Sequence, residues 1–313
     1  MKIVFIGTPE FGAIILEGLI KSIYKPVLVI TPTDKPAGRK QVITPPPVKV
    51  LAGKYGIKVE QPEKISDFKS ELSLLKPDMI IVAAYGQIIP KEILDIPKYG
   101  CLNIHPSLLP KYRGASPIQA AILNNDKRTG VTIILMDEKI DHGQIIAQRS
   151  MMLEEKERAR NLHDKLAQLS LNLLLETISN LEKGLTKLTI QDDSQATFTK
   201  TLNKGEGVIN WKKPADMIER EIRAFEYWPG SFTFWTKLNV PLRIKITKAR
   251  VLKSMKGIDY SIGQTFVVLK NEIGVQCGED FFVIERLQLE GKEEVSSEEF
   301  LRGYPNFIGA ILK

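Results

Sequence analysis

The sequence predicts an α/β protein with an open, mostly parallel sheet in its first half and a small all-β barrel in its second half. Two observations predict this class. Apolar, strand-like runs alternate with helical patterns through the first half, as they do where crossover helices join parallel strands. After the polar passage QDDSQATFTKTLNKGEG, the composition changes to short apolar runs separated by turn residues, which is typical of a small barrel.

The strands of the first half are predicted from continuous apolar runs. Such runs occupy residues 2–7, 27–30, 79–86, 101–105 and 130–136. Apolar residues at helical spacing predict helices in FGAIILEGLIKSI and near KEILDI, between these runs. Ligands of open α/β sheets bind outside the carboxyl ends of the strands, so residues at those ends are the first candidates for a functional site.

A longer amphipathic helix is predicted over residues 158–184, where leucines recur at three- and four-residue spacing before Gly184. We interpret His163, on this helix, as a partly exposed structural residue. The later strands are expected in RIKIT, QTFVVL, IGVQC and FFVIERLQL. The expected domain boundaries are 1–189 for the sheet domain, 190–204 for a linker and 205–313 for the barrel.

Composition restricts the class of protein. The chain has 313 residues, 43% of them hydrophobic, and no apolar run approaches the roughly 20 residues that span a bilayer. A strand is predicted within one residue of Met1, so we expect no leader peptide and a cytoplasmic protein without membrane association. We also expect a monomer. Cys101 and Cys277 show no metal-ligand spacing, so we interpret them as buried thiols and expect no metal site.

Two common active-site motifs are not supported. GTPEFG, after the first strand, lacks both the GxGxxG spacing and the Lys-Ser/Thr of a phosphate-binding loop, which disfavours nucleotide binding. The sequence also lacks a GxSxG elbow, and no motif links Ser107 to a base, so hydrolysis by a serine triad is not indicated.

The segment CLNIHPSLLPKYRGASP places Asn103 and His105 at the end of a predicted strand. Residues i and i+2 of an extended strand point to the same side, so the amide and the imidazole can converge on one small group. Both can donate to an oxygen that becomes negative when a carbonyl is attacked, and an imidazolium can also act as general acid. The residues alone allow a second interpretation, in which both cap a turn.

An imidazolium that persists near neutral pH needs a carboxylate nearby. The segment MDEKIDHGQI supplies three, and we choose Asp141, in the DHG turn, over Asp137 and Glu138. His142, in the same turn, is an alternative proton carrier.

NIHPSLLPKYRGASPI followed by MDEKIDHG resembles the folate-dependent formyltransferases. FIGTPEFG, TPTDKPAGRKQVITPPPVK, ATFTKTLNKGEGVINW and LQLEGKEEVSSEEFLRGY extend the resemblance over essentially the whole chain, to the members of the family that act on methionyl-tRNA. The resemblance implies a Rossmann-like catalytic domain and an OB-like barrel. It implies 10-formyltetrahydrofolate as formyl donor, the α-amine of methionyl initiator tRNA as acceptor, a role in translation initiation, and no metal.

The resemblance also implies roles for particular residues. Asn103, His105 and Asp141 are the expected catalytic group. The expected folate contacts are Ser107, Leu108, Leu109 and Pro110, with segment 83–90 as another wall of the pocket. Arg39 and Lys40, in the long proline-punctuated loop after the second strand, are the expected tRNA contacts.

The basic excess is modest overall but concentrated in the second half. Lysine and arginine total 44 against 37 acids, a net charge of +7. The following basic residues occur without an intervening acid: Lys237, Arg243, Lys245, Lys248, Arg250, Lys253 and Lys256. They form either a phosphate-facing surface or a solvated charged face, because Arg243 and Lys248 have opposite strand parity unless a bulge intervenes.

Three other functions compete. A formyltransferase for a ribonucleotide amine or an amino sugar would keep the same catalytic residues, but the PAGRK loop and the barrel argue against it. A formyltetrahydrofolate hydrolase would release formate without an added acceptor. A non-enzymatic RNA-binding protein would explain the barrel and the charge, but it gives no reason for the catalytic group.

Overall fold

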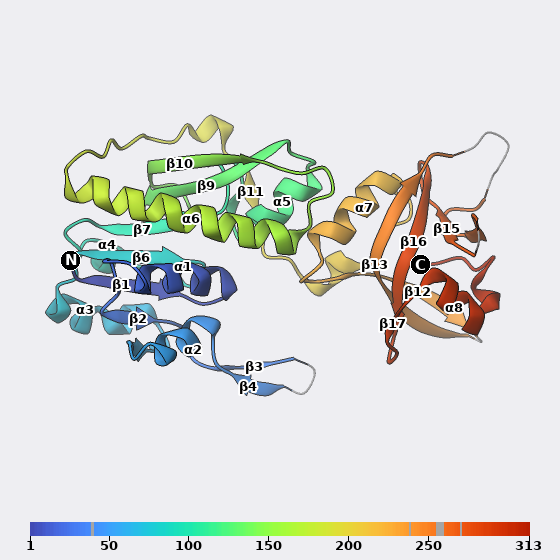
Figure 1. Ribbon diagram of the computed structural model, residues 1–313, viewed down its shortest axis with the longest axis horizontal. Coiled ribbons are helices and arrows are strands. Elements are labelled where there is room, and N and C mark those ends of the chain that lie inside the picture. The colour runs from blue at the N-terminus through green and yellow to red at the C-terminus, as the bar shows by residue number, and fades with distance from the viewer. Residues whose placement is uncertain (39–40, 238, 255–259, 270) are drawn as a thin grey trace. The chain divides into compact units, whose positions relative to one another are not determined.

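This computed structural model describes residues 1–38, 41–237, 239–254, 260–269 and 271–313. The chain divides into two compact units, which Figure 1 shows in their sequence colours. The first unit comprises Met1–Pro117, Arg128–Leu153 and Leu162–Lys200, and the second comprises Ile118–Lys127, Glu154–Asn161 and Thr201–Lys313. The predicted class, a mostly parallel α/β sheet followed by a small β domain, is confirmed. Among the described helices, none has the length and apolar character needed to span a membrane.

The sheet of the first unit has seven strands in the order β10-β9-β7-β6-β1-β2-β5. They are β1 (Ile3–Gly7), β2 (Leu28–Ile30), β5 (Lys58–Glu60), β6 (Met79–Ala83), β7 (Cys101–His105), β9 (Arg128–Leu135) and β10 (Gln144–Met152). The first five are parallel, while β9 runs antiparallel to β7, and β10 to β9. All five predicted strands are present. The two edge strands, β5 and β10, were not predicted, because their partly exposed residues do not form continuous apolar runs.

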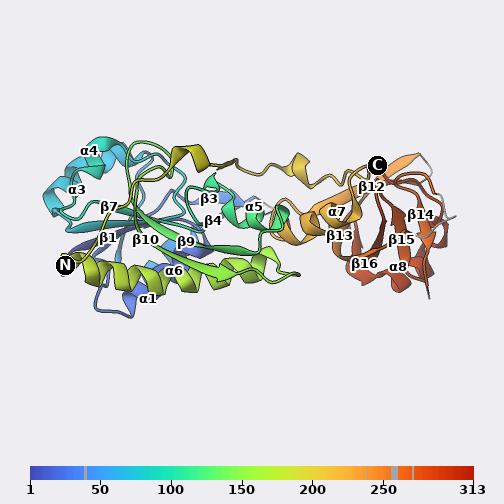
Figure 2. The ribbon, with the colours of Figure 1, turned by 90° about the horizontal axis from the view of Figure 1, so that it is seen from above.

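The helices of this unit are α1 (Glu10–Ile20), α2 (Pro47–Lys54), α3 (Lys69–Leu75), α4 (Lys91–Leu94) and, from Leu162 onward, α6 (Ala159–Glu182). All of α5 (Pro117–Leu123) except Pro117 belongs to the second unit. Figures 1 and 2 show α1 and α6 along one face of the sheet and α3 and α4 on the other. Gly18 lets α1 and α6 approach closely, because a Cβ there would lie 2.0 Å from Leu171. His163 contacts the ring of Phe11 edge-on at 5.6 Å, which agrees with a structural role.

The order of the strands fixes where a ligand can bind. The chain leaves β1 for β2 and β5 on one side, then returns to β6 and β7 on the other. Connections therefore diverge from the neighbouring strands β1 and β6, and a crevice at their carboxyl ends is the expected binding place in such a sheet. Asn103, on β7, pairs with Val82 of β6 and so lies beside this point.

Two short pairings complete the first unit. β3 (Lys35–Ala37) and β4 (Val42–Thr44) form a hairpin, and β8 (Arg113–Gly114) pairs in parallel with β11 (Phe198–Thr199). The second pairing attaches part of the polar passage, for which a linker was expected, to the loop that follows β7.

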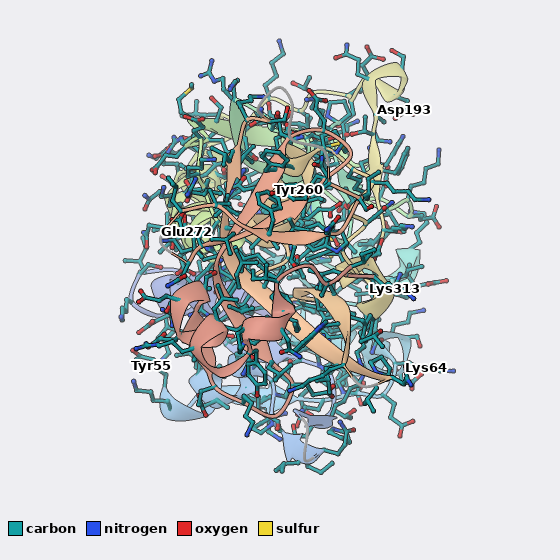
Figure 3. All side chains as sticks on the ribbon, turned by 90° about the vertical axis from the view of Figure 1, so that its right-hand side faces the viewer. Tyr55, Lys64, Asp193, Tyr260, Glu272 and Lys313 are labelled. Atoms are coloured by element: carbon teal, nitrogen blue, oxygen red, sulfur yellow. The ribbon has the colours of Figure 1, made fainter. Side chains whose placement is uncertain are left out.

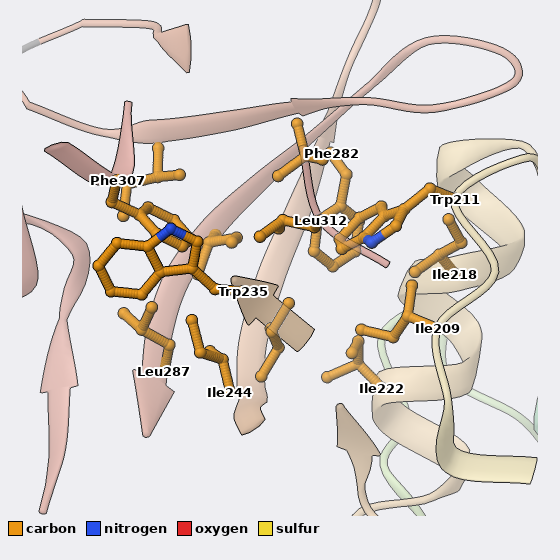
Figure 4. Close-up of a cluster of buried hydrophobic side chains, with 14 of the residues drawn as sticks. Ile209, Trp211, Ile218, Ile222, Trp235, Ile244, Phe282, Leu287, Phe307 and Leu312 are labelled. Atoms are coloured by element: carbon orange, nitrogen blue, oxygen red, sulfur yellow. The ribbon is translucent and has the colours of Figure 1, made fainter. Parts of the chain in front are cut away.

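The second unit is a small antiparallel sheet in the order β12-β13-β16-β15-β14, with β17 on β16. Its elements are η3 (Lys204–Gly207), α7 (Ala215–Ala224), β12 (Ser231–Lys237), β13 (Val240–Leu252), β14 (Thr265–Val267), β15 (Ile273–Gln276), β16 (Phe281–Leu289), β17 (Glu294–Ser296), α8 (Ser297–Gly303) and η4 (Pro305–Phe307). Figure 4 shows the core between sheet and helices, in which Trp211, Trp235, Phe282 and Phe307 are all buried. The four predicted strands are found, while α7 and α8 were not predicted.

Candidate active site

Asn103 and His105, both on β7, reach the carboxylate of Asp141. The Nδ2 of Asn103 donates to Oδ1 of Asp141 at 3.0 Å. The Nδ1 of His105 lies 3.5 Å from Oδ2 of the same carboxylate, and the two side chains are 5% and 12% exposed. The geometry of an extended strand predicts that the amide and the imidazole converge, and the structure brings both onto Asp141.

The imidazole of His105 is also held from its other side. Its Nε2 lies 2.8 Å from the carbonyl oxygen of Tyr112. A carbonyl oxygen only accepts hydrogen bonds, so Nε2 carries a hydrogen. A ring protonated on both nitrogens would donate to Tyr112 through Nε2 and face the carboxylate of Asp141 through Nδ1. This arrangement suits a general acid that has a carboxylate partner.

Asp141 lies in the turn between β9 and β10, in the left-handed conformation with a φ of 48°. For a residue with a side chain this conformation costs about 1–2 kcal/mol, although aspartate tolerates it better than most. The backbone N–H of Gly114 donates to Oδ2 of Asp141 at 2.8 Å. A Cβ at Gly143 would lie 1.9 Å from the carbonyl oxygen of Leu135, so only glycine fits there. Backbone contacts thus fix the turn that carries Asp141.

The alternative residues of this turn point elsewhere. The Oδ2 of Asp137 lies 2.5 Å from Nδ1 of His142. The Nε2 of His142 lies 3.3 Å from a carboxylate oxygen of Asp193. Glu138 is exposed. Of the three acids in the turn, Asp141 is the one in contact with His105.

Gln191 contacts the turn of Asp141 and Arg113 contacts Gln191, and neither residue was predicted from the sequence. The Nε2 of Gln191 donates to the backbone carbonyls of Asp141 at 2.9 Å and Gly143 at 2.8 Å. The buried Arg113 donates to Oε1 of Gln191 through Nε at 3.1 Å and Nη2 at 2.8 Å. Gln191 belongs to the polar passage, where composition gives no signal that separates it from its exposed neighbours.

The SLLP loop after β7 is tied to β9 through Thr132. The Oγ1 of Thr132 donates to the carbonyl of Ser107 at 2.7 Å and accepts from the N–H of Leu109 at 3.0 Å. Ser107 and Leu109 are buried, while Leu108 and Pro110 are partly exposed. The buried pair therefore fixes the shape of the loop, and the other pair presents side chains at its surface.

Two buried hydroxyls lie just beyond the carboxyl ends of β1 and β6. Neither the hydroxyl of Thr8 nor that of Tyr85 has a hydrogen-bond partner within the described ranges. Burial raises the pKa of Tyr85. Because β1 and β6 are neighbours at the point where connections diverge, these unpaired hydroxyls are candidates for contacts to a bound ligand.

Arg39 and Lys40 lie outside the described residues. The described residues on either side of them pair as β3 and β4, and the chain before β3 is anchored. The carboxylate of Asp34 accepts from Nζ of Lys49 at 2.8 Å and from Nε2 of Gln61 at 2.9 Å. The long basic connection is therefore a hairpin with a fixed base.

Five residues of the predicted basic cluster fall into two groups. One group is paired with acids at 2.7–3.0 Å: Lys248 with Glu285, Arg250 with Glu272 (labelled in Figure 3) and Lys253 with Asp280. The other group lies over aromatic rings: Arg243 is 3.8 Å from the centroid of Phe232 and Lys237 is 4.8 Å from that of Tyr304. The register of β13 shifts between Ile246 and Lys248, which supplies the bulge required to align Arg243 and Lys245 with Lys248 and Arg250. Lys256 lies outside the described residues.

Comparison with known proteins identifies the family. The family model "Formyl transferase" matches residues 1–178, and the model "Formyl transferase, C-terminal domain" matches residues 201–305. The chain belongs to the formyl transferase family. A relative from Caldanaerobacter subterraneus subsp. tengcongensis, named methionyl-tRNA formyltransferase, is 42% identical over 316 residues, with 100% of both chains covered. A relative of the same name from Caldicellulosiruptor saccharolyticus is 41% identical over 318 residues, again with 100% of both chains covered.

Solved structures of other formyl transferases share the fold. The N-formyltransferase from Helicobacter canadensis, solved with folinic acid and dTDP-3-aminofucose, matches 94% of this chain and 100% of its own with a TM-score of 0.66 at 21% identity. HypX from Aquifex aeolicus, solved with tetrahydrofolic acid, matches 98% of this chain and 47% of its own with a TM-score of 0.62 at 18% identity. At these identities the likeness shows the fold alone.

Proposed function

We propose that this formyl transferase moves the formyl group of 10-formyltetrahydrofolate to the α-amino group of methionyl initiator tRNA, for translation initiation. The observation that carries the proposal is full-length similarity, at 42% and 41% identity, to relatives named for this reaction. The cluster of Asn103, His105 and Asp141 at a strand end provides the chemistry that the reaction needs.

The cluster is suited to an attack on a formyl carbon. The neutral amine forms a bond to that carbon, whose oxygen becomes negative. The amine nitrogen then loses a proton to water, the carbonyl reforms, and the bond to the folate nitrogen breaks. The Nδ2 of Asn103 has two hydrogens, of which the bond to Asp141 takes one, so the second can donate to the oxygen. Asp141 holds the imidazolium of His105, and the proton gained by the folate nitrogen comes from His105 or from a water held with Asp141.

The folate site is assigned to the surface of the SLLP loop. Leu108 and Pro110 present partly exposed side chains there, and Ser107 and Leu109 fix the backbone. Segment 83–90, with the buried hydroxyl of Tyr85, is assigned to the facing wall.

Two surfaces are assigned to tRNA. One is the segment of Arg39 and Lys40, which follows β3 in the sequence; the chain before β3 is anchored through Asp34. In the second unit, Lys237 and Arg243 lie over rings, so stacking rather than an acid holds these cations on β12 and β13. Cations held in this way are suitable for phosphate contacts.

The test is a formylation assay. Purified protein is incubated with 10-formyltetrahydrofolate and methionyl initiator tRNA, and formylmethionine is measured after hydrolysis of the ester. Methionyl elongator tRNA and a reaction without acceptor are the controls. We expect formylmethionine with the initiator, far less with the elongator, and little formate without acceptor. Formate release at the same rate with and without tRNA would instead identify a hydrolase and contradict the proposal.

A further inference from the structure

We propose that Gln191 is a positioning residue for formyl transfer, which holds Asp141 where that carboxylate meets Asn103 and His105. Arg113, in turn, holds Gln191. The inference rests on the proposed function, which gives the reaction that Asn103, His105 and Asp141 carry out. It assigns a role in the active site to a segment whose composition indicates only a linker.

The amide of Gln191 closes the turn of Asp141. Its Nε2 donates to the carbonyls of both Asp141 and Gly143, which lie on either side of His142 in the chain. Left-handed backbone at a residue with a side chain persists only where the surroundings hold it, and Asp141 has a φ of 48°. The two hydrogen bonds from Gln191 are direct restraints on that backbone. They thereby set the direction of the Asp141 side chain.

The other end of the amide is equally fixed. Gln191 is 7% exposed, so both ends of its side chain need partners. Arg113 supplies two hydrogen bonds to Oε1, and its Nη2 also donates to Asp193 at 2.7 Å. The pairing of β8 with β11 brings these parts of the chain together, since Arg113 faces Phe198 in the register.

Arg113 reaches Asp141 by a second route as well. The residue that follows it, Gly114, donates its backbone N–H to Oδ2 of Asp141 at 2.8 Å. The carboxylate is thus held through the β8 backbone, and its own backbone is held through Gln191. β8 takes part in both restraints, because the N–H of Gly114 bonds the carboxylate and the side chain of Arg113 bonds Gln191.

The donor atom, rather than the size of the side chain, is what the turn requires. Carbonyl oxygens only accept, so an oxygen in place of Nε2 would face two acceptors. Gln191→Glu makes this replacement and keeps an oxygen for Arg113, now with opposite charge. The segment therefore stays attached while the restraint on Asp141 is lost. Gln191→Ala removes both contacts and serves as the second variant.

Kinetics give the first readout. For Gln191→Glu and Gln191→Ala we expect kcat to fall at least ~10-fold, since small displacements of reacting groups are costly. The KM for 10-formyltetrahydrofolate should stay within about two-fold, because the SLLP loop is held separately through Thr132. The matched control is Gln195→Ala in the same segment, where the exposed amide donates to Asp192 and kcat should be unchanged.

Amide NMR gives a readout of the carboxylate position that activity alone cannot give. Labelling arginine with ¹³C at the carbonyl and glycine with ¹⁵N selects the Arg-Gly pairs, which occur at 113–114 and 302–303. The signal of Gly114 reports its bond to Asp141, and that of Gly303, in α8, is an internal reference. We expect the Gly114 signal to move in both Gln191 variants and to stay in place in Gln195→Ala.

Two results would overturn the proposal: a kcat for Gln191→Glu within about two-fold of wild type, or an unchanged Gly114 signal in both variants. Failure of the proposed function looks different. In that case the wild-type protein forms no formylmethionyl-tRNA, while the Gly114 signal still tests whether Gln191 positions Asp141.

Discussion

The carboxylate of Asp141 has protein partners at both of its oxygens. Oδ1 accepts from Asn103, while Oδ2 accepts from the N–H of Gly114 and faces the ring of His105. Asn103 and His105, which we propose as catalytic together with Asp141, are therefore both held by its carboxylate. When residues act through one shared group, the losses of kcat from their single substitutions are not expected to multiply when the substitutions are combined.

The first prediction concerns these three side chains one at a time. Asn103→Ala, His105→Ala and Asp141→Ala should each lower kcat by roughly 100-fold or more, the scale for loss of an oxyanion donor or its support. Steady-state formylation of initiator tRNA measures the loss, and a thermal melt shows whether each variant is folded. A folded His105→Ala variant with near-normal turnover would contradict the assignment.

The second prediction concerns the pair. Asn103→Ala combined with Asp141→Ala should reduce kcat by about as much as the more severe single change, because the hydrogen bond between them is already lost in either one. The double variant is assayed beside both single variants. Losses that multiply would mean that the two residues act independently.

A third prediction concerns the cysteines. Burial raises the pKa of Cys101 to about 12, and burial likewise raises that of Cys277 to about 12. The thiolate is the reactive form, so at pH 8 both thiols should remain unmodified by a disulfide reagent while the protein is folded. In guanidinium both should react, since an exposed thiol has a pKa near ~8.5. Stoichiometric reaction of the native protein would disprove this burial.

In the sheet of the first unit, the strands that could be predicted from the sequence are those buried on both faces. β1 and β6 are fully buried, and each is a continuous apolar run. β10, at the edge of the sheet, has only partly buried and exposed residues. Its sequence therefore lacks the continuous apolar run that separates a buried strand from a loop. The hairpin of β3 and β4 was missed for a related reason, because prolines punctuate it and β4 is exposed.

That hairpin carries the fourth prediction. The chain before β3 is anchored through Asp34, and we propose that the segment between β3 and β4, which includes Arg39, wedges into the end of the acceptor stem. Opening a base pair costs a few kcal/mol, and the cost is lowest where the pair is defective. An initiator tRNA whose acceptor stem has a weak first base pair is therefore easier to open. Arg39→Ala should therefore lower kcat/KM on initiator tRNA at least ~10-fold, with folate affinity unchanged.

The control for Arg39→Ala is the tRNA rather than the protein. Wild type and variant are compared on the initiator and on the same tRNA with a strong first base pair. If the two proteins behave alike on both, the loop is not the wedge.

At the scale of the whole molecule, the run of basic residues that begins at Lys237 and has no intervening acid in the sequence overstates the basic surface of the second unit. Lys248, Arg250 and Lys253 are each paired with an acid. Sequence alone could not show this, because the partner acids come from other strands and loops.

The fifth prediction follows from this division. Lys237→Ala with Arg243→Ala should weaken tRNA binding and reduce its salt dependence by about one counterion per lost phosphate contact. Lys248→Ala with Arg250→Ala removes the same charge from residues already paired, and it should have a smaller effect. Binding is measured by titration at several salt concentrations. Equal salt slopes for the two double variants would remove the distinction between the groups.

The candidate site could be predicted only where one strand carries it. The spacing of Asn103 and His105 is a local property of an extended chain, so sequence was sufficient. Asp141 had to be chosen among three acids, and the choice depends on a turn that only the fold defines. Gln191 lies 50 residues beyond Asp141 in the chain, so no local pattern could indicate the contact.

The pairing of β11 with β8 decides where this protein can be divided into two pieces. A fragment that ends at residue 178, where the match to the first family model ends, or at residue 189 would lack Gln191, Asp193 and β11. A split-protein pair or an inserted protease site placed there would separate Asp141 from its restraint. The first unit ends at Lys200, so a cut within residues 201–203 leaves Asp141, Gln191, Asp193 and β11 on one polypeptide.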